Sequence, residues 1–195
     1  MVANFGYGAL LITFVVSLYG IAAAVYGART NRQDWIDSAR LAMLLTFPLL
    51  TLSALSLIYL LVNGHYEVEF VASVTSDSMP GYLKVTSLWG GQSGSLVFWA
   101  WLMSAFASAV TLRKWNRDRE FLPWVIVVSL VTLAFFIFLN LAFENPFERI
   151  WLAPTGQPIV AMFQPAGAQL FMQNDGRGLN PLLRHPGMII HPPML

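Results

Sequence analysis

Two histidines near the carboxyl-terminal end of the sequence are each followed directly by a proline. His185 precedes Pro186, and His191 precedes Pro192. Proline biases the residue before it towards an extended backbone and stiffens the chain after it, so a rigid turn would present the imidazole of His191. Neutral imidazole is a common axial ligand of haem iron. A haem-iron ligand is therefore one interpretation of His191, and an ordinary loop histidine is the other.

Arginines accompany these histidines in the polar segment formed by residues 144–195. They are Arg149, Arg177 and Arg184. A guanidinium group pairs well with carboxylates, including the propionates of haem. Arg149 and Arg184 are therefore candidates for the surroundings of a haem. The third histidine, His65, lies just after an apolar run, and we interpret it as a headgroup-level residue without special chemistry.

A glycine-rich turn over residues 89–95 precedes another apolar run and reads Trp-Gly-Gly-Gln-Ser-Gly-Ser. Three glycines in five positions allow the backbone to approach another surface closely, and Gly94 and Ser95 could leave exposed amides at a helix start. Such a turn could cradle a carboxylate. The candidate binding residues are Trp89, Gly90, Gly91 and Gly94. The alternative is a flexible loop whose tryptophan lies at the membrane boundary, a depth that tryptophan favours in any case.

Other kinds of site find little support in the sequence. The chain has no cysteine, which excludes disulfides, zinc-thiolate sites, iron–sulfur clusters and cysteine nucleophiles within it. GxSxG, P-loop and HExxH motifs are absent, so no catalytic residue is assigned. A net charge of +1 gives no reason to expect a nucleic-acid partner.

The elements that position these residues are predicted to be transmembrane helices. Hydrophobic residues make up 56% of the chain and charged residues only 11%, against the roughly 25% charged residues usual for soluble domains. Four apolar runs that contain no Asp, Glu, Lys, Arg or His are close to the roughly 20 residues that a helix needs to cross the hydrocarbon layer. The predicted spans are residues 5–26, 41–62, 96–112 and 121–143. The sequence thus predicts an all-α, polytopic membrane protein in which residues 1–195 form a single membrane domain.

The basic residues predict how the helices are oriented. The short connection between the first two spans and the one between the last two hold seven of the eleven basic residues, namely Arg29, Arg32, Arg40, Arg113, Lys114, Arg117 and Arg119. By the positive-inside rule these connections are cytoplasmic. We therefore expect the N-terminus and the irregular loops over residues 63–95 and 144–195 on the outer side. Alternating apolar and charged residues predict a short strand over residues 66–71, and residues 154–167 are expected to be irregular.

Four short motifs, taken in order, resemble a known family of membrane proteins. They are Trp89-Gly90-Gly91-Gln92-Ser93-Gly94-Ser95-Leu96, Asn145-Pro146-Phe147-Glu148-Arg149, Leu179-Asn180-Pro181-Leu182-Leu183 and His191-Pro192-Pro193. Together with the predicted topology, they resemble the amino-terminal portion of the CcmF family of cytochrome c-type biogenesis proteins. The resemblance covers essentially the whole chain and only the first part of the family's length.

This resemblance implies a role in cytochrome c maturation, in which haem b is received and passed to apocytochrome c. His191 would match one of two outer-face histidines that ligate the incoming haem, and the glycine-rich turn would lie near it. The implied partners are membrane lipid, apocytochrome c and other maturation proteins, including a haem chaperone. The implied location is the inner (plasma) membrane. The chain would be a component of a haem lyase without a catalytic site of its own.

The sequence also departs from the family's pattern. An acidic residue often occupies the position of Ser93, so a role that depends on that charge is in doubt here. The family's tryptophan-rich haem-binding segment, second outer histidine and membrane-embedded histidine pair would lie beyond Leu195. We therefore expect a fragment of a longer protein or a split form whose remainder is a separate chain.

Two functions of other classes remain open at this point. The chain could be a transporter or channel subunit whose outer loops form a lid, although no Asp, Glu, Lys, Arg or His lies within a span. Asn63 and Asn140 are the strongest polar residues near the spans, and both could simply cap or bond locally. A membrane scaffold that docks assembly partners without binding haem is the other alternative.

Overall fold

Four long helices dominate the structure, a computed structural model that describes residues 1–113, 115, 119–187, 189 and 190. Each of the four is long and apolar enough to cross a membrane. They are α1 (Val2–Thr30), α2 (Gln33–Val62), α5 (Gln92–Leu112) and α6 (Leu122–Ala142). The predicted all-α, multi-pass membrane fold is confirmed, and a small sheet is added to it.

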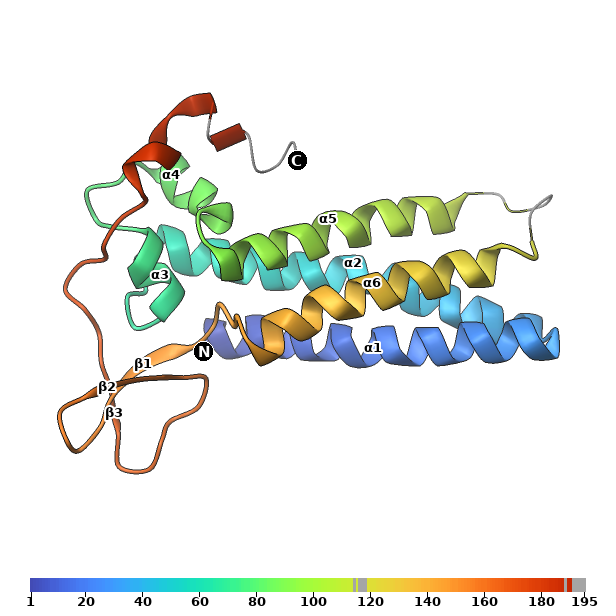
Figure 1. Ribbon diagram of the computed structural model, residues 1–195, viewed down its shortest axis with the longest axis horizontal. Coiled ribbons are helices and arrows are strands. Elements are labelled where there is room, and N and C mark those ends of the chain that lie inside the picture. The colour runs from blue at the N-terminus through green and yellow to red at the C-terminus, as the bar shows by residue number, and fades with distance from the viewer. Residues whose placement is uncertain (114, 116–118, 188, 191–195) are drawn as a thin grey trace.

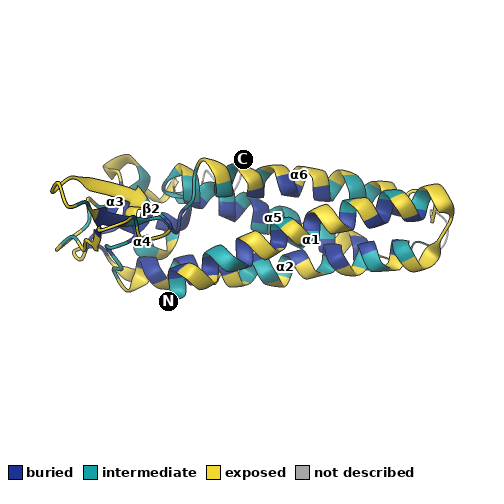
Figure 2. Cartoon of the chain, turned by 90° about the horizontal axis from the view of Figure 1, so that it is seen from below, coloured by how far each residue is buried: buried dark blue, intermediate teal, exposed yellow. Residues whose placement is uncertain are grey.

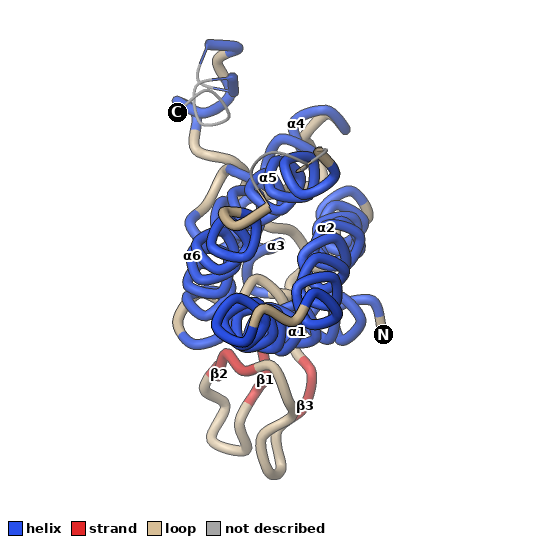
Figure 3. The backbone as a smooth tube through the Cα atoms, turned by 90° about the vertical axis from the view of Figure 1, so that its right-hand side faces the viewer, coloured by secondary structure: helices blue, strands red, loops and turns tan. Residues whose placement is uncertain are grey.

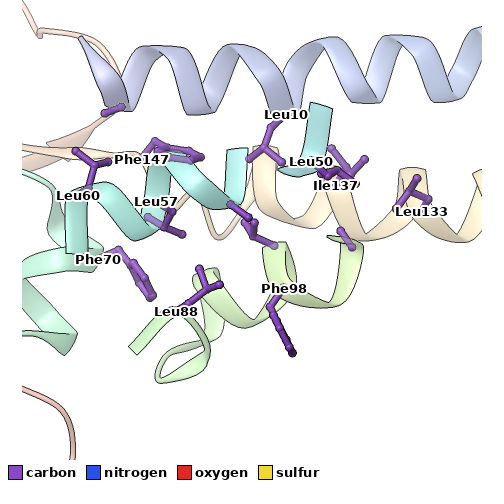
Figure 4. Packing of buried hydrophobic residues seen from close by; sticks show 14 of the residues in the cluster. Leu10, Leu50, Leu57, Leu60, Phe70, Leu88, Phe98, Leu133, Ile137 and Phe147 are labelled. Carbon is purple, nitrogen blue, oxygen red and sulfur yellow. The ribbon is translucent and has the colours of Figure 1, made fainter. Parts of the chain in front are cut away.

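The four helices surround a common core in the ring order α1, α2, α5 and α6, and α6 closes the ring on α1 (Figure 3). Leu10, Leu50 and Ile137 meet in the core from three of these helices and are fully buried (Figure 4). The outward faces remain largely exposed along the length of the bundle (Figure 2). Exposed apolar side chains such as Phe135 and Val128 on those faces suit a surrounding of lipid.

The helices differ from the predicted spans mainly at their ends. α1 and α2 both continue beyond their apolar runs, so only Asn31 and Arg32 separate them. The turn is possible because Asn31 adopts a left-handed backbone conformation, with φ of 53°, which asparagine tolerates better than most residues. α5 begins at Gln92, within the glycine-rich turn, rather than at the predicted residue 96.

The polar connections separate into two groups at opposite ends of the bundle (Figure 1). The α1–α2 turn and the α5–α6 connection lie at one end, where Arg29, Arg32, Arg40, Arg113 and Arg119 are described. Lys114 and Arg117 fall outside the described residues. The N-terminus, the two long connections and the small sheet lie at the other end, which we call the outer end. As predicted, the short basic connections lie at one end of the bundle and the long connections lie at the other.

The first long connection folds into short helices. They are α3 (Glu69–Val74), α4 (Gly81–Thr86) and the 3-10 helix η1 (Ser87–Trp89). The strand predicted over residues 66–71 is wrong beyond a single bridge between Val68 and Arg149. From Glu69 onwards the chain is helical because Phe70, Val71 and Val74 have the spacing of one helical face, and all three are buried.

The second long connection contains a three-stranded antiparallel sheet, so it is less irregular than expected. The strands are β1 (Arg149–Leu152), β2 (Pro158–Ala161) and β3 (Gln169–Leu170), in the order β2-β1-β3. β1 pairs with β2 across a tight turn at Gly156, whose φ of 79° favours glycine. The indole of Trp151 donates a hydrogen bond to the carbonyl of Ala161 at 2.9 Å. A further 3-10 helix, η2 (Pro181–Arg184), comes after the sheet.

Phe147 fastens the end of α6 to the start of α1. Its ring is fully buried (Figure 4) and occupies the space that a side chain at Gly6 would need. The Asn145 side chain accepts a hydrogen bond from the Phe147 amide at 3.1 Å, which fixes the turn that points the ring inwards. The sheet therefore begins from an anchored position beneath α1.

We expect Phe147→Ala to destabilise the protein by about 3–5 kcal/mol, because truncation of a buried aromatic ring leaves a cavity. Phe143→Ala is the matched control, since Phe143 lies four residues earlier and is 72% exposed. That change should alter stability by no more than about 0.5 kcal/mol. The measurement is unfolding in detergent, monitored by circular dichroism. Equal losses in the two variants would contradict the anchoring role of Phe147.

Candidate site at the outer end of the bundle

A strap formed by residues 175–179 ties the second long connection to the first. The Arg177 amide donates to the Ala72 carbonyl at 2.8 Å, and the Gly178 amide donates to the Thr75 carbonyl at 3.1 Å. Gly176 allows this close approach, because a side chain there would collide with the Thr75 carbonyl. The strap is thereby fixed across α3.

Two carboxylates reinforce the strap. The Tyr66 hydroxyl donates to Asp77 at 2.8 Å, and Asp175 accepts hydrogen bonds from the amides of Asp77 at 2.8 Å and Gly176 at 2.7 Å. The bond from the Asp77 amide, together with that from Gly176, lowers the pKa of Asp175 below its usual value. Burial, together with the neighbouring Asp77, raises the pKa of the Tyr66 phenol. Nothing in the local sequence predicts this cluster, because its members lie about a hundred residues apart.

The strap brings the carboxyl-terminal segment to the glycine-rich turn. The indole of Trp89 donates a hydrogen bond to the carbonyl of Ile189 at 2.9 Å, in a helical turn that comes after η2. His191 and the prolines after it lie outside the described residues, so its predicted role as a ligand is not tested. His185 is described, and its Nδ1 accepts a hydrogen bond from the Gly187 amide at 3.2 Å.

The glycines of the turn are used for close packing within the protein. A side chain at Gly90 would collide with Leu179 of the strap region, and one at Gly94 would collide with the Leu88 carbonyl and the Phe70 ring. Gly91 also lies against Phe70. The close approach expected from three glycines is therefore present, and the surfaces involved are α3 and the residues around the strap.

The candidate arginines are not all at the same place. The Arg184 Nε donates to the Leu179 carbonyl at 3.1 Å, which places Arg184 on the side of the glycine-rich turn. Arg149 lies on the small sheet, where its guanidinium donates to Asn4 of α1 at 2.7 Å. The sheet lies beneath α1, whereas the carboxyl-terminal segment lies on the opposite side of the bundle, the side of α5 (Figures 1 and 3). The described residues thus bring Arg184, but not Arg149, towards Trp89.

An aromatic cavity lies directly beneath Trp89. It has a volume of about 280 Å³ between α2 and α5 and is lined by Leu88, Trp89, Phe98, Trp101, Thr51 and three aliphatic residues of α2. The rings of Trp89, Phe98 and Trp101 lie one after another with centroids 5.0 and 6.1 Å apart. This surface suits a flat apolar molecule. Trp101 falls within the third predicted span, and its contact with the ring system of Trp89 depends on the fold of the turn.

A polar group joins the start of α5 to the end of α6. The Ser93 hydroxyl donates to the Glu144 carboxylate at 2.8 Å. The side-chain nitrogen of Asn140 faces two backbone carbonyl oxygens. It donates hydrogen bonds to the carbonyls of Ser93 and Glu144 at 3.0 and 3.1 Å. Asn140 therefore links two helices, whereas Asn63 bonds locally to the Tyr59 carbonyl at 2.8 Å. A carboxylate thus lies beside Ser93, although position 93 itself carries no charge.

Another carboxylate, that of Glu148, lies a short distance along the chain. Burial raises the pKa of Glu148, and the neighbouring carboxylates of Glu69 and Glu144 raise it further. In the described part of the chain, no three histidine, aspartate or glutamate side chains gather to hold a metal ion. The outer end therefore offers an apolar aromatic surface and an arginine, while the iron ligand predicted from the sequence lies outside the described residues.

Comparison with known proteins places these features in a family. The sequence profile described as Cytochrome C assembly protein matches residues 89–195, which is more than half of the chain. The chain belongs to this family. The matched region begins at Trp89 and contains α5, α6, the sheet and the strap.

Several curated proteins are similar over the chain's full length or nearly so. The chain is 29% identical over 196 residues to the cytochrome c-type biogenesis protein CcmF of Escherichia coli (strain K12), covering 100% of this chain and 27% of that protein. It is 30% identical over 172 residues to the probable cytochrome c-type biogenesis protein NrfE of the same organism, covering 88% and 28%. The chain thus spans about a quarter of the length of these relatives.

A solved structure named cytochrome c heme lyase CcmF has a similar fold. Its TM-score with this chain is 0.70 at 19% sequence identity, and the match covers 75% of this chain and 25% of that one. At this level of identity the likeness shows the fold. The helix bundle and the order of its helices therefore also occur in that solved structure.

We expect Gly94→Ala to destabilise the protein by about 1–3 kcal/mol, because overpacking displaces the backbone of the turn as well as the Phe70 ring. Gly81→Ala is the control, since Gly81 belongs to the same connection and has open space where a side chain would be added. Thermal unfolding in detergent would compare the two variants. An unchanged midpoint for Gly94→Ala would show that the turn is not tightly packed.

Two carboxylates should affect stability in opposite directions as pH changes. The lowered pKa of Asp175 means that its charge stabilises the folded protein above pH 4, an effect lost as pH falls through the folded pKa. The raised pKa of Glu148 means that its charge is unfavourable when folded, so stability is lost as pH rises through the folded pKa. Asp175→Asn should therefore lower the melting temperature at pH 7.5, and Glu148→Gln should raise it. Both differences should narrow in melting curves recorded towards pH 3.5; a difference of constant size would contradict this account.

Proposed function

We propose that this chain takes part in cytochrome c maturation by binding haem b at the outer end of the bundle, for attachment to apocytochrome c. Membership of the cytochrome C assembly protein family supports this proposal, as do the names of the relatives that are similar over the whole chain. The chain spans about a quarter of the length of these relatives. The proposal therefore covers only the part of the process that this portion of the protein would perform.

The observation that carries the proposal is the hydrogen bond between the Trp89 indole and the Ile189 carbonyl, at 2.9 Å. Ile189 lies only two residues before His191, so the chain length between them is at most about 7 Å. A ligand bound by His191 would therefore lie within reach of the aromatic surface around Trp89. No other described contact joins the glycine-rich turn so directly to the histidine-bearing segment.

Three features support haem as the substrate. The cavity beneath Trp89 offers aromatic faces to an apolar ring, and Arg184 offers a guanidinium group to a propionate. His191 would supply one axial nitrogen to the iron. Gly90, Gly91 and Gly94 would act by letting Leu179 and Phe70 close upon the turn, which holds Trp89 in place. Arg149 would reach the substrate only from the side of the sheet.

The proposal extends to partners and location. The chain has no cysteine, so the sulfur atoms of a thioether bond would come from apocytochrome c. A haem chaperone and other maturation proteins would meet the outer end, where the long connections lie. We propose that the chain forms a single membrane domain in the inner membrane, with the outer end on the periplasmic side, and acts as a component of a haem lyase.

We expect His191→Ala to reduce the Soret absorbance of the purified assembly by more than half and to lower cytochrome c maturation. His185→Ala is the matched control, because His185 also precedes a proline and its Nδ1 is engaged by the Gly187 amide within the same turn. The measurement is haem absorbance per protein, with helical content checked by circular dichroism. Unchanged maturation in the His191 variant would overturn the assignment.

The His191 and His185 variants, together with changes in the outer connections, separate the other two functions. A scaffold would keep its partners and its maturation activity in the His191 variant, and would lose both when the outer connections are altered. A transporter or channel subunit would show no change of haem content in either variant. Either result would replace the haem-binding proposal.

A further inference from the structure

A second candidate site lies at the opposite end of the bundle from the glycine-rich turn. A cavity of about 280 Å³ lies there between α2, the end of α5 and the start of α6. Three arginines from three different segments line it, namely Arg40, Arg113 and Arg119. None of these residues takes part in the proposed binding of haem.

The described lining of the cavity carries an excess of positive charge. Among the described residues that line it, the one acidic residue is Asp37, which accepts a hydrogen bond from the Gln33 side chain at 3.1 Å, and Glu120 lines the adjoining cavity. Arg40 is held in place because its Nε donates to the Thr111 carbonyl at 3.0 Å. That bond uses only one of the donors of its guanidinium group. Within this described lining, three arginines against one carboxylate suit an anion with several oxygen atoms.

The cavity also has the surroundings of a membrane boundary. The Arg113 guanidinium lies over the ring of Trp115, 5.7 Å from its centroid, and Trp115 lines the same cavity. Trp124, which is 48% exposed, lines the adjoining cavity. Tryptophan is enriched at the depth of lipid headgroups, so an anion bound here would lie at that depth.

An apolar groove of about 350 Å³ runs along the bundle close to these arginines. Its wall is formed by α5 and α6 and includes Phe106, Val110, Val128 and Leu133. Val110 precedes Arg113 by three residues, which is about 4.5 Å along a helix axis. Phe106 and Val128 are 70% and 67% exposed, so the groove opens towards the surrounding hydrocarbon. A cavity suited to a charged lipid headgroup and a groove suited to an acyl chain therefore lie next to each other.

We propose that the arginine cavity binds the phosphodiester of an anionic phospholipid, with one acyl chain lying in the groove between α5 and α6. Arginines from α2 and from both ends of the α5–α6 connection would then be held together by one headgroup. The lipid would stabilise the end of the bundle where α5 and α6 approach each other. A free phosphate ion could satisfy the arginines but would leave the groove unused.

The test is native mass spectrometry of the purified chain in detergent, with phosphatidylglycerol or phosphatidylcholine of the same acyl chains. The wild-type protein should retain phosphatidylglycerol in preference to phosphatidylcholine. Each basic residue near a membrane surface contributes roughly a fivefold effect, so Arg119→Gln should weaken retention about fivefold and Arg113→Gln with Arg119→Gln about 25-fold. Arg29→Gln is the matched control, because Arg29 is exposed at the same end without lining the cavity.

Three outcomes would overturn the proposal. Equal retention of the two lipids would show that the headgroup charge is not recognised. A loss in Arg29→Gln as large as that in Arg119→Gln would show a diffuse effect of charge. Displacement of phosphatidylglycerol by millimolar inorganic phosphate would show an anion site that does not require a lipid. Circular dichroism of each variant, and the single Arg119 change beside the double one, separate loss of binding from loss of fold.

Discussion

The hydrocarbon layer offers no water to peptide groups, and this constraint orders the whole chain. Within the layer every backbone N–H and C=O has to find its partner inside the protein, which a helix achieves within a single segment. The helices α1, α2, α5 and α6 meet this requirement, and the irregular backbone is confined to the two ends. One end needs only a two-residue turn and one short connection. The other receives the sheet, the short helices and the strap.

The outer end is held from two sides that lie far apart in sequence. Beneath α1, Phe147 fills the space at Gly6 and starts the sheet from an anchored position. Across α3, the strap uses main-chain hydrogen bonds at Arg177 and Gly178. Beyond the strap, the carboxyl-terminal segment comes to lie beside Trp89. The motif that contains Phe147 therefore supports the outer end mechanically, while the Trp89 turn faces the proposed substrate.

Sequence patterns predicted the helices well because a lipid surrounding demands an apolar composition over a known length. They failed for residues 66–71, because alternation suggests a strand while burial of Phe70, Val71 and Val74 requires a helical face. The strap was not predicted, since its bonds use peptide groups that every sequence possesses. The link from Ser93 to Glu144 was missed because it depends on which helices are neighbours. The glycines predicted a close approach of the turn to another surface, but they did not predict that Leu179 and Phe70 form that surface. The role of His191 stays a prediction.

The strap has an uneven tolerance of change over evolutionary time. Gly176 leaves no room for a side chain beside the Thr75 carbonyl, and Gly178 has a φ of 79° that other residues rarely adopt. Arg177 stands between them and contributes its amide to the strap, so its side chain is free to vary as long as it is not proline. Substitutions at position 177 would therefore change the charge of the outer surface without moving the carboxyl-terminal segment, because the amide hydrogen bond remains. Two glycines whose positions disfavour a side chain would thus flank a residue whose charge can change.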